Sequence, residues 1–301
     1  MTPPTLGLAI FFLMTFGTCI FAESPPTVSP PAKDTSPPKI VVYKTVTDQG
    51  QQRPLRLFIF EPPDRSPPRP AIILFHSGGW DHGSPRNSYD MARRFARAGL
   101  VAICAEYRLI GEKGADNGNT VFESVRDARS AVRYLRSHAS ELGIDAKRIV
   151  AAGGSAGGHL ALSTASFEGD SVDDPNDDLS ISPKPRALVL FNPVVDTSPA
   201  GYGNQKLGGR WQELSPLHHV QAGLPPAIMF HGTADRVAPF VGAQRYTDAT
   251  LAAGNICEFH PQEGAGHGDY RKEPVFTEVI SLTLAFLERQ NVLTASQVMA
   301  P

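Results

Sequence analysis

The feature that most constrains the fold of this chain is a regular alternation between short apolar runs and longer amphipathic stretches. The middle runs are apolar on successive residues, as in strands that are covered on both faces. The first two runs alternate between polar and apolar residues, which suits an edge hairpin. The predicted strands are 40–46, 55–60, 71–75, 100–105, 149–152, 187–191, 227–230 and 256–260.

Helical spacing separates these runs. Apolar residues recur at three- and four-residue steps from Phe122 to Leu135, and arginines occupy the other faces of this predicted helix. Asn119 or Thr120 can cap its start, and further helices are predicted over 91–98 and 276–287. The alternation predicts an α/β fold with a mostly parallel eight-stranded sheet, helices on both faces and no large cap domain. Ligands of such sheets bind at the carboxyl ends of the strands.

The first 38 residues predict export. Residues 6–22 carry no charged side chain, which favours a signal peptide over 1–22 that is cleaved after Ala22. An uncleaved anchor and a lipoprotein signal at Cys19 are the alternatives. Six prolines within 24–38 predict an extended linker over 23–38. We therefore expect an α/β domain over 39–301 that is secreted or periplasmic, with membrane anchoring by the N-terminal segment as the alternative.

Composition excludes several classes of protein. A net charge of −2 provides no electrostatic footprint for nucleic acid. Three cysteines are too few for a disulfide scaffold or a structural zinc site. Cys104 and Cys257 fall in predicted strands that are not expected to be neighbours, so we expect buried free thiols. We expect neither a metal nor a cofactor.

A strand–turn–helix pattern surrounds Ser155. The predicted strand 149–152 leads into Gly153-Gly154-Ser155-Ala156-Gly157-Gly158, and helix-forming residues follow. This is a G-x-S-x-G pattern in the setting that exposes a nucleophilic serine hydroxyl on a tight turn. The N–H of Ala156, at the helix start, is then a candidate oxyanion donor. The alternatives are a glycine-rich phosphate-binding turn and simple tight packing.

A second glycine-rich loop follows the predicted strand 71–75. It reads His76-Ser77-Gly78-Gly79-Trp80, and glycines after a strand end let backbone N–H groups face a ligand. Gly78 and Gly79 are the predicted oxyanion donors, and His76 is interpreted as a structural anchor of the loop. Trp80 either walls the substrate pocket or packs under the loop.

The acid and the base are predicted after the last two strands. Asp235 follows the strand 227–230, and His267 lies between two glycines after the strand 256–260. The chain order Ser155, Asp235, His267 is that of a triad on this kind of fold. His267 would take the serine proton, and Asp235 would orient the imidazole. The rivals are His218, His219 and His231 for the base and Glu263 for the acid.

Two loops remain open to interpretation. The stretch 168–178 has six carboxylates without calcium-loop spacing and is interpreted as a solvated loop, with a cation site as the alternative. The segment 196–224 would lie on the rim of the site. Its Tyr202 and Trp211 are predicted to bind substrate, along with Leu207 and Leu214, unless the segment is a packing insertion.

These motifs resemble the α/β-hydrolase superfamily over about residues 54–287. They are most similar to the secreted esterase/lipase branch that includes hormone-sensitive-lipase-like, feruloyl and acetyl-xylan esterases. The resemblance implies a carboxylester hydrolase with Ser155, Asp235 and His267 as its triad. Gly154 stands where lipase-like relatives often have Asp, and Ser77 interrupts an HGGG-type run. Both departures favour the carbohydrate-esterase side.

The expected function is that of a secreted serine esterase acting through an acyl-enzyme. Its expected substrate is a short acyl or aryl ester, either a small molecule or an esterified polysaccharide of the acetyl-xylan or feruloyl type. We expect no stable membrane partner after signal cleavage. An arylformamidase or a peptidase-like hydrolase is the alternative within the same chemistry, because arylformamidases share a similar glycine loop and serine turn. A non-catalytic binding domain on this scaffold is the alternative of another class.

Overall fold

The computed structural model describes residues 1, 36–48, 50–64, 66, 68–111 and 118–294. The predicted signal peptide, apart from Met1, and the linker up to residue 35 lie outside the described residues. Among the helices that are described, none combines the length and apolarity that crossing a membrane requires.

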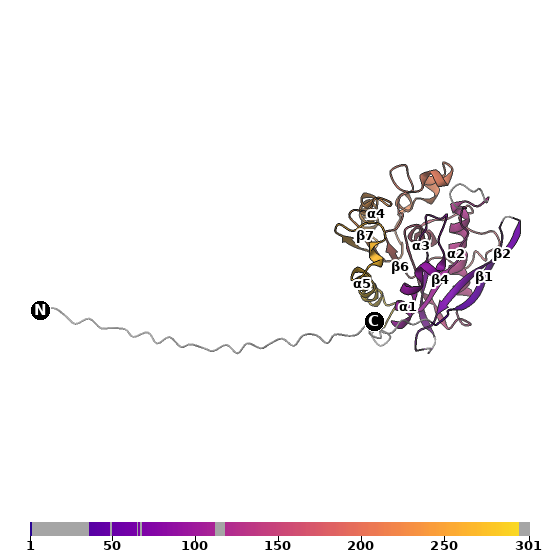
Figure 1. Ribbon diagram of the computed structural model, residues 1–301, viewed down its shortest axis with the longest axis horizontal. Helices are drawn as coiled ribbons and strands as arrows, with labels where there is room; N and C mark the ends of the chain where they lie inside the picture. Colours follow the sequence, from indigo (N-terminus) through magenta and orange to yellow (C-terminus); the bar gives the residue numbers. More distant parts are fainter. Residues whose placement is uncertain (2–35, 49, 65, 67, 112–117, 295–301) are drawn as a thin grey trace. The chain divides into compact units, whose positions relative to one another are not determined.

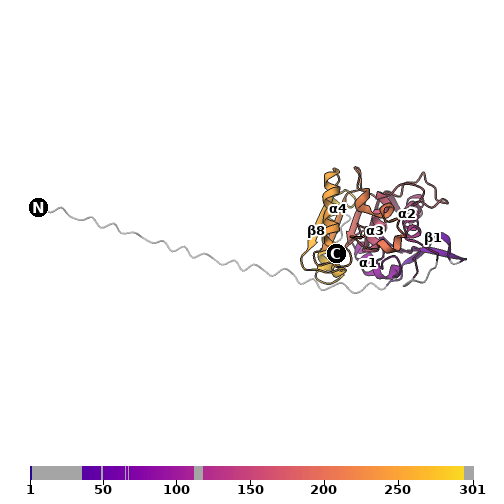
Figure 2. The same ribbon diagram turned by 90° about the horizontal axis from the view of Figure 1, so that it is seen from above.

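Eight strands form one mostly parallel sheet, which confirms the predicted fold. The sheet order is β1-β2-β4-β3-β5-β6-β7-β8, so β1 and β8 form its edges (Figure 2). Only the pairings β1–β2 and β2–β4 are antiparallel, as the predicted edge hairpin requires. The strands are β1 (Lys39–Asp48), β2 (Gln51–Phe60), β3 (Arg69–Phe75), β4 (Val101–Ala105), β5 (Ile144–Gly154), β6 (Ala187–Phe191), β7 (Ala227–Gly232) and β8 (Cys257–Gln262).

Five helices cover the two faces of this sheet. α1 and α5 lie on one face, and α2, α3 and α4 lie on the other (Figure 1). Thr120 caps α2 and forms a capping box with Glu123, whereas the Asn119 amide binds Asp48. The helices are α1 (Tyr89–Arg97), α2 (Val121–Ser137), α3 (Ala156–Ser166), α4 (Phe240–Ala252) and α5 (Val275–Arg289), with short 3-10 turns η1 (Pro85–Ser88), η3 (Asn204–Leu207), η4 (Trp211–Leu214), η5 (Pro216–His219) and η6 (Asp269–Arg271).

Strand β3 illustrates why the central runs are apolar at every residue. Ile72 and Leu74 pack in the core under α1 and α5, whereas Ile73 and Phe75 pack in the core under α2 and α3. Because successive side chains of a strand point to opposite faces, two covered faces require an uninterrupted apolar run. Cys104 on β4 and Cys257 on β8 are buried free thiols, as predicted.

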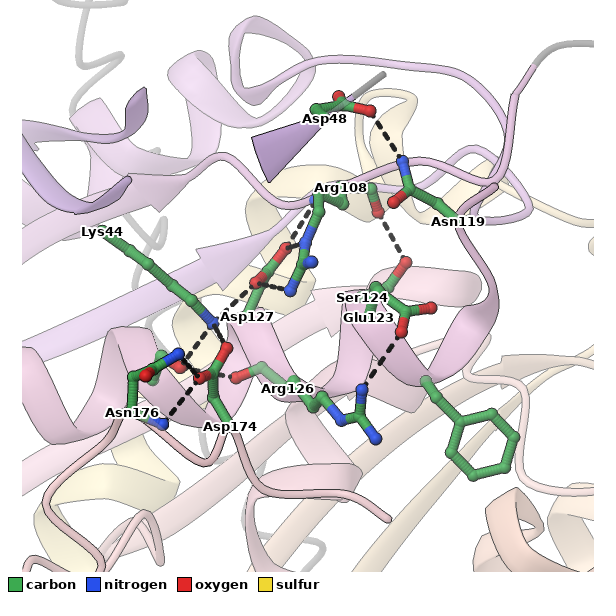
Figure 3. A network of polar contacts seen from close by, with 12 residues as sticks. Lys44, Asp48, Arg108, Asn119, Glu123, Ser124, Arg126, Asp127, Asp174 and Asn176 are labelled. Atoms are coloured by element: carbon green, nitrogen blue, oxygen red, sulfur yellow. Dashed lines mark hydrogen bonds and ion pairs between the residues drawn. The ribbon is translucent and has the colours of Figure 1, made fainter. Parts of the chain in front are cut away.

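The acidic stretch 168–178 is a solvated loop only in part: Glu168, Asp170 and Asp178 are exposed, whereas Asp173, Asp174 and Asp177 form ion pairs. Lys44 on β1 reaches both Asp174, at 2.6 Å, and Asp127 of α2, at 3.0 Å (Figure 3). Arg129 of α2 forms a two-pronged ion pair with Asp173. Arg129 and Arg133, which lie on the non-apolar faces of α2, thus find carboxylate partners in this stretch. Charged side chains are rarely buried unless they are paired, so the basic side chains of β1 and α2 and the aspartates of the acidic stretch become buried together.

Arg108 completes this network. Its guanidinium contacts both carboxylate oxygens of Asp127 at 2.8 and 2.7 Å, and the Asp127 side chain is fully buried. Figure 3 shows Asp127 between Lys44 and Arg108. The network therefore joins β1, the loop after β4, α2 and the acidic stretch.

Candidate active site

The carboxyl ends of β5, β7 and β8 bring three predicted residues together. Ser155 follows β5, Asp235 follows β7, and His267 lies in the loop after β8. The Ser155 Oγ lies 2.9 Å from the His267 Nε2, and the His267 Nδ1 lies 2.7 Å from the Asp235 Oδ2. The carboxyl ends of parallel strands share one edge of the sheet, which accounts for this convergence.

Ser155 occupies a strained turn between β5 and α3. Its backbone has φ 56° and ψ −123°, a conformation that costs a residue with a side chain about 1–3 kcal/mol. The Ser155 N–H donates to the Phe191 carbonyl at 3.0 Å, which holds the turn. A Cβ at Gly157 would lie 2.0 Å from the Phe75 carbonyl oxygen, so only glycine fits there. Ala156 begins α3 and presents the third predicted oxyanion donor.

The Asp235 carboxylate is fully buried and accepts four hydrogen bonds. Its Oδ1 accepts the backbone N–H groups of Val237 and Ala238, and its Oδ2 accepts from His267 and from the Asn192 amide, both at 2.7 Å. Burial raises the pKa of this carboxyl, but the hydrogen bonds from His267, Asn192 and Val237 outweigh burial and hold it below its usual range. Asn192 was not among the residues predicted from the sequence, although it directly follows the buried strand β6, which was a usable signal.

This environment determines the tautomer of His267. An ionised carboxylate can only accept, so the His267 Nδ1 donates to Asp235. Its Nε2 then carries the lone pair and accepts the hydrogen bond of the Ser155 hydroxyl. The His267 side chain is 22% exposed, so it borders solvent. The arrangement can move a proton from Ser155 to His267.

None of the rival residues takes these places. His231 is fully buried, lies 2.8 Å from the Ala238 carbonyl through its Nε2, and has a pKa lowered by burial. His218 and His219 form hydrogen bonds with residues of their own loop. Glu263 is exposed, and in the described part of the chain no hydrogen bond joins it to His267.

The loop after β3 carries the two predicted glycine donors. Gly78 and Gly79 have φ 131° and 58°, and their N–H groups have no acceptor among the described residues. His76 is an anchor of this loop: it stacks on Tyr107, whose hydroxyl donates to the His76 carbonyl at 2.8 Å. Burial lowers the pKa of His76 to about 4, so its ring is neutral near pH 7.

Lys206 is a second residue that the sequence analysis missed. It lies on η3 within the segment 196–224, and its ammonium donates to the Gly79 carbonyl at 3.0 Å and to Asp81 at 2.7 Å. The segment is thereby tied to the loop that carries the candidate oxyanion donors. Lysine is common on protein surfaces, and a single lysine in a loop forms no sequence pattern that would predict this contact.

The predicted substrate-binding aromatics differ in position. Of the two alternatives for Trp80, the structure supports packing under the loop rather than substrate binding: the side chain is fully buried, edge-on to His159 at 5.1 Å. The Trp80 ring packs between the loop and α3, and burial of its large apolar surface stabilises this contact. Tyr202 is half-buried against Trp80, and Trp211 is half-buried edge-on to His218. Leu207 and Leu214, in contrast, belong to the core.

Two open hollows flank these elements. One, of about 330 Å³, is lined by Tyr202 and by residues that include Pro239 and Arg245. The other, of about 490 Å³, is lined by residues that include Gly154 and Phe276. Trp211 is not among the described lining residues of either hollow. The second hollow reaches Gly154 beside the serine turn, and neither Ser155 nor His267 is among the described lining residues of either hollow.

Comparison with known proteins finds a matching family and similar solved structures. The model of the BD-FAE family matches residues 57–248. The structure of Thermogutta terrifontis esterase 2 phosphoramylated by tabun is 38% identical with a TM-score of 0.78, and the match covers 87% of this chain and 97% of that chain. Propionate-bound and butyrate-bound structures of this esterase have TM-scores of 0.77 at 38% and 37% identity, and cover 85% and 86% of this chain and 96% of theirs.

Curated relatives are more distant in sequence. A probable isoprenylcysteine alpha-carbonyl methylesterase of Arabidopsis thaliana is 25% identical, over 78% of this chain and 54% of the relative. The carboxylesterase NlhH of Mycobacterium tuberculosis is 28% identical, over 70% of this chain and 69% of the relative. The chain spans about half the length of the first curated relatives that it matches. From its eight-stranded sheet and the matched residues 57–248, the chain belongs to the BD-FAE family and has the α/β-hydrolase fold.

Proposed function

We propose that this protein is a serine carboxylester hydrolase with Ser155 as nucleophile, His267 as base and Asp235 as the orienting acid. The observation that carries the proposal is the continuous pair of hydrogen bonds, 2.9 Å from Ser155 to His267 and 2.7 Å from His267 to Asp235. Support also comes from the esterase names of the structural and curated relatives.

The proposed reaction has two halves. The Ser155 Oγ attacks the ester carbonyl carbon while His267 takes the hydroxyl proton, and the N–H groups of Gly78, Gly79 and Ala156 accommodate the oxyanion. The tetrahedral intermediate collapses, the ester C–O bond breaks, and His267 returns the proton to the leaving alcohol. Water, deprotonated by His267, then attacks the acyl-enzyme and releases the carboxylic acid.

We propose short acyl esters as the substrate class. Esterase 2 of Thermogutta terrifontis, of comparable length, has been solved with propionate and with butyrate bound. The 196–224 segment is tied down by Lys206 rather than forming a large cap, which suits the ester groups of a polysaccharide as well as small esters. The test is a panel of p-nitrophenyl acetate, butyrate and decanoate, with methyl ferulate and acetylated xylan. Activity confined to decanoate would overturn the short-acyl and carbohydrate-ester proposals.

Export is part of the proposal and has its own test. We propose that the protein is secreted or periplasmic after removal of residues 1–22, on the basis of the uncharged apolar run 6–22. N-terminal sequencing of the protein from its native host should begin at Glu23. A mature chain that still begins at Met1 would contradict signal cleavage.

Ser155→Ala tests the nucleophile. It should lower the kcat for p-nitrophenyl acetate by at least about a thousandfold, because the residual rate then comes from binding and the oxyanion site alone. Ser137→Ala, at an exposed serine at the end of α2, is the matched control and should leave kcat within twofold. Wild-type activity in Ser155→Ala would refute the assignment.

Two further measurements separate the alternatives. Faster turnover of N-formylkynurenine than of any acetate ester would identify an arylformamidase instead. Failure of the wild-type protein to react with a fluorophosphonate probe and to hydrolyse any ester would favour a binding domain.

A further inference from the structure

The Ser77 hydroxyl lies between the oxyanion loop and the nucleophile turn. Its Oγ is 2.9 Å from the Gly154 carbonyl oxygen and 2.7 Å from the Nη2 of Arg271. Ser77 directly precedes Gly78, and Gly154 directly precedes Ser155. One hydrogen bond thus joins the residue before the candidate oxyanion donors to the residue before the candidate nucleophile.

The direction of this hydrogen bond follows from its partners. A guanidinium can only donate, and a carbonyl oxygen can only accept. The Ser77 hydroxyl therefore accepts from Arg271 and donates its single proton to the Gly154 carbonyl. Because the donor is charged, the Arg271 contact is of the stronger kind, and it uses a lone pair of the Ser77 oxygen while the hydroxyl proton stays available for Gly154.

The peptide unit between Gly154 and Ser155 is held at both ends. Its carbonyl accepts from Ser77 at 2.9 Å, and its N–H donates to the Phe191 carbonyl at 3.0 Å. Rotation of this unit would carry the Ser155 side chain with it, and Ser155 is already in a strained conformation. The hydrogen bond from Ser77 to Gly154 therefore holds the strained turn at Ser155 and also fixes the distance between this turn and the loop after β3.

Arg271 is itself fixed by Tyr270. Its Nε donates to the Tyr270 hydroxyl at 2.9 Å, and its guanidinium carbon lies 5.2 Å from the Tyr270 ring centroid. Tyr270 is buried and stacks on Phe191 at 5.1 Å. A Cβ at Gly154 would lie 2.0 Å from the Tyr270 hydroxyl and 3.0 Å from the Ser77 Oγ. The missing side chain at residue 154 is what makes room for both groups.

We propose that Ser77 and Arg271 are positioning residues that hold the oxyanion loop in register with the nucleophile turn. This proposal rests on the proposed function, because the register matters only if Ser155 attacks an ester. The interruption of the glycine run by Ser77 and the glycine at residue 154 are then parts of one arrangement.

The arrangement acts chiefly on the transition state. Backbone donors aimed at an oxyanion stabilise the charge that develops during attack much more than the neutral ester carbonyl. Loosening the loop should therefore lower kcat and leave KM nearly unchanged. A role confined to folding would instead lower the melting temperature without separating kcat from KM.

The test uses the full-length protein and p-nitrophenyl acetate. Ser77→Ala and Arg271→Met should each lower kcat about tenfold, with KM within twofold of the wild type. The double variant should be no more than about twofold slower than the worse single variant, because both changes break the same connection. Ser77→Thr retains the hydroxyl and should recover most of the activity. Arg289→Met, at an exposed ion pair with Glu258, is the matched arginine control.

The outcomes separate this proposal from the proposed function. An active wild type with kcat within twofold in both single variants, or with only KM altered, overturns the positioning role and leaves the esterase proposal intact. Losses that multiply in the double variant overturn the shared connection. A wild type that hydrolyses no ester overturns both proposals. If Arg271→Met or Ser77→Ala does not fold, Arg271→Gln and Ser77→Gly test the same contact.

Discussion

Replacing Asp235 by asparagine tests the electrostatic order of the triad, because the two side chains have the same shape. The Oδ1 position of Asp235 receives two backbone N–H groups, so the amide oxygen of an asparagine belongs there. The amide nitrogen then faces His267 and donates to its Nδ1. The Asn192 Oδ1, which has no hydrogen-bond partner among the described residues, can rotate to accept the other amide proton.

The consequence is the wrong tautomer of the base. His267 then carries its proton on Nε2, which lies 2.9 Å from the Ser155 Oγ and can no longer accept from it. In a protease triad, the same substitution lowers kcat about 10⁴-fold, which corresponds to about 5 kcal/mol of barrier. We expect a loss of this size in Asp235→Asn at pH 7.

The assay is steady-state hydrolysis of p-nitrophenyl acetate, with urea unfolding to verify that the variant is folded. Glu263→Gln is the control, since Glu263 is exposed and is the rival acid from the sequence; its kcat should stay within twofold of the wild type. A folded Asp235→Asn variant that keeps more than a tenth of the wild-type kcat would refute the tautomer argument. A large loss in Glu263→Gln would move the acid role to that residue.

Three further outcomes are expected. Asp127→Asn leaves Lys44 and Arg108 without the buried charge of Asp127 and should lower the free energy of unfolding in urea by about 3–5 kcal/mol. The control Arg289→Met, at an exposed ion pair, should lower it by about 1 kcal/mol or less, and equal losses in the two variants would contradict the buried network. Lys206→Met should lower kcat about tenfold at constant KM by releasing the oxyanion loop, and a change in KM alone would argue against this role. Burial lowers the pKa of both His76 and His159 to about 4, so the unfolded chain binds these protons first, and each histidine should contribute up to about 3 kcal/mol to a fall in the free energy of unfolding as pH falls from 6.5 to 4. His159→Gln should therefore remove about half of this dependence in urea titrations, and an unchanged slope would exclude His159 as a source.

Strands were predicted correctly where both faces of the strand are buried, because every residue of such a strand is apolar. β6 spans Ala187–Phe191, as the apolar run predicts. β5 was predicted too short, because it begins at Ile144 and continues through residues such as Asp145 and Lys147, which are only partly buried or exposed. The start of β5 is a strand because its backbone pairs with β3, where Ile144 lies opposite Arg69. Backbone pairing does not require apolar side chains, so the sequence shows no pattern there.

The site residues could be predicted where a neighbouring sequence pattern, such as the end of a strand, identified them. Ser155, Asp235 and His267 each follow a strand end, and the fold brings such ends together. Asn192 and Lys206 escaped notice because their partners lie 43 and 127 residues away along the chain. Their side-chain chemistry is ordinary, and only the contact gives it a role.

The sequence by itself determined the alternation of strands and helices, the order of the candidate triad and the two glycine-rich turns, since all of these follow from local backbone and burial preferences. Only the tertiary structure decided that Trp80 is buried, that the acidic stretch 168–178 pairs with α2, and that Ser77 bridges Gly154 and Arg271. Each of these depends on which side chain meets which across the folded chain. The physical reason is that hydrogen bonds and ion pairs act over a few ångströms in space, whatever the separation in sequence.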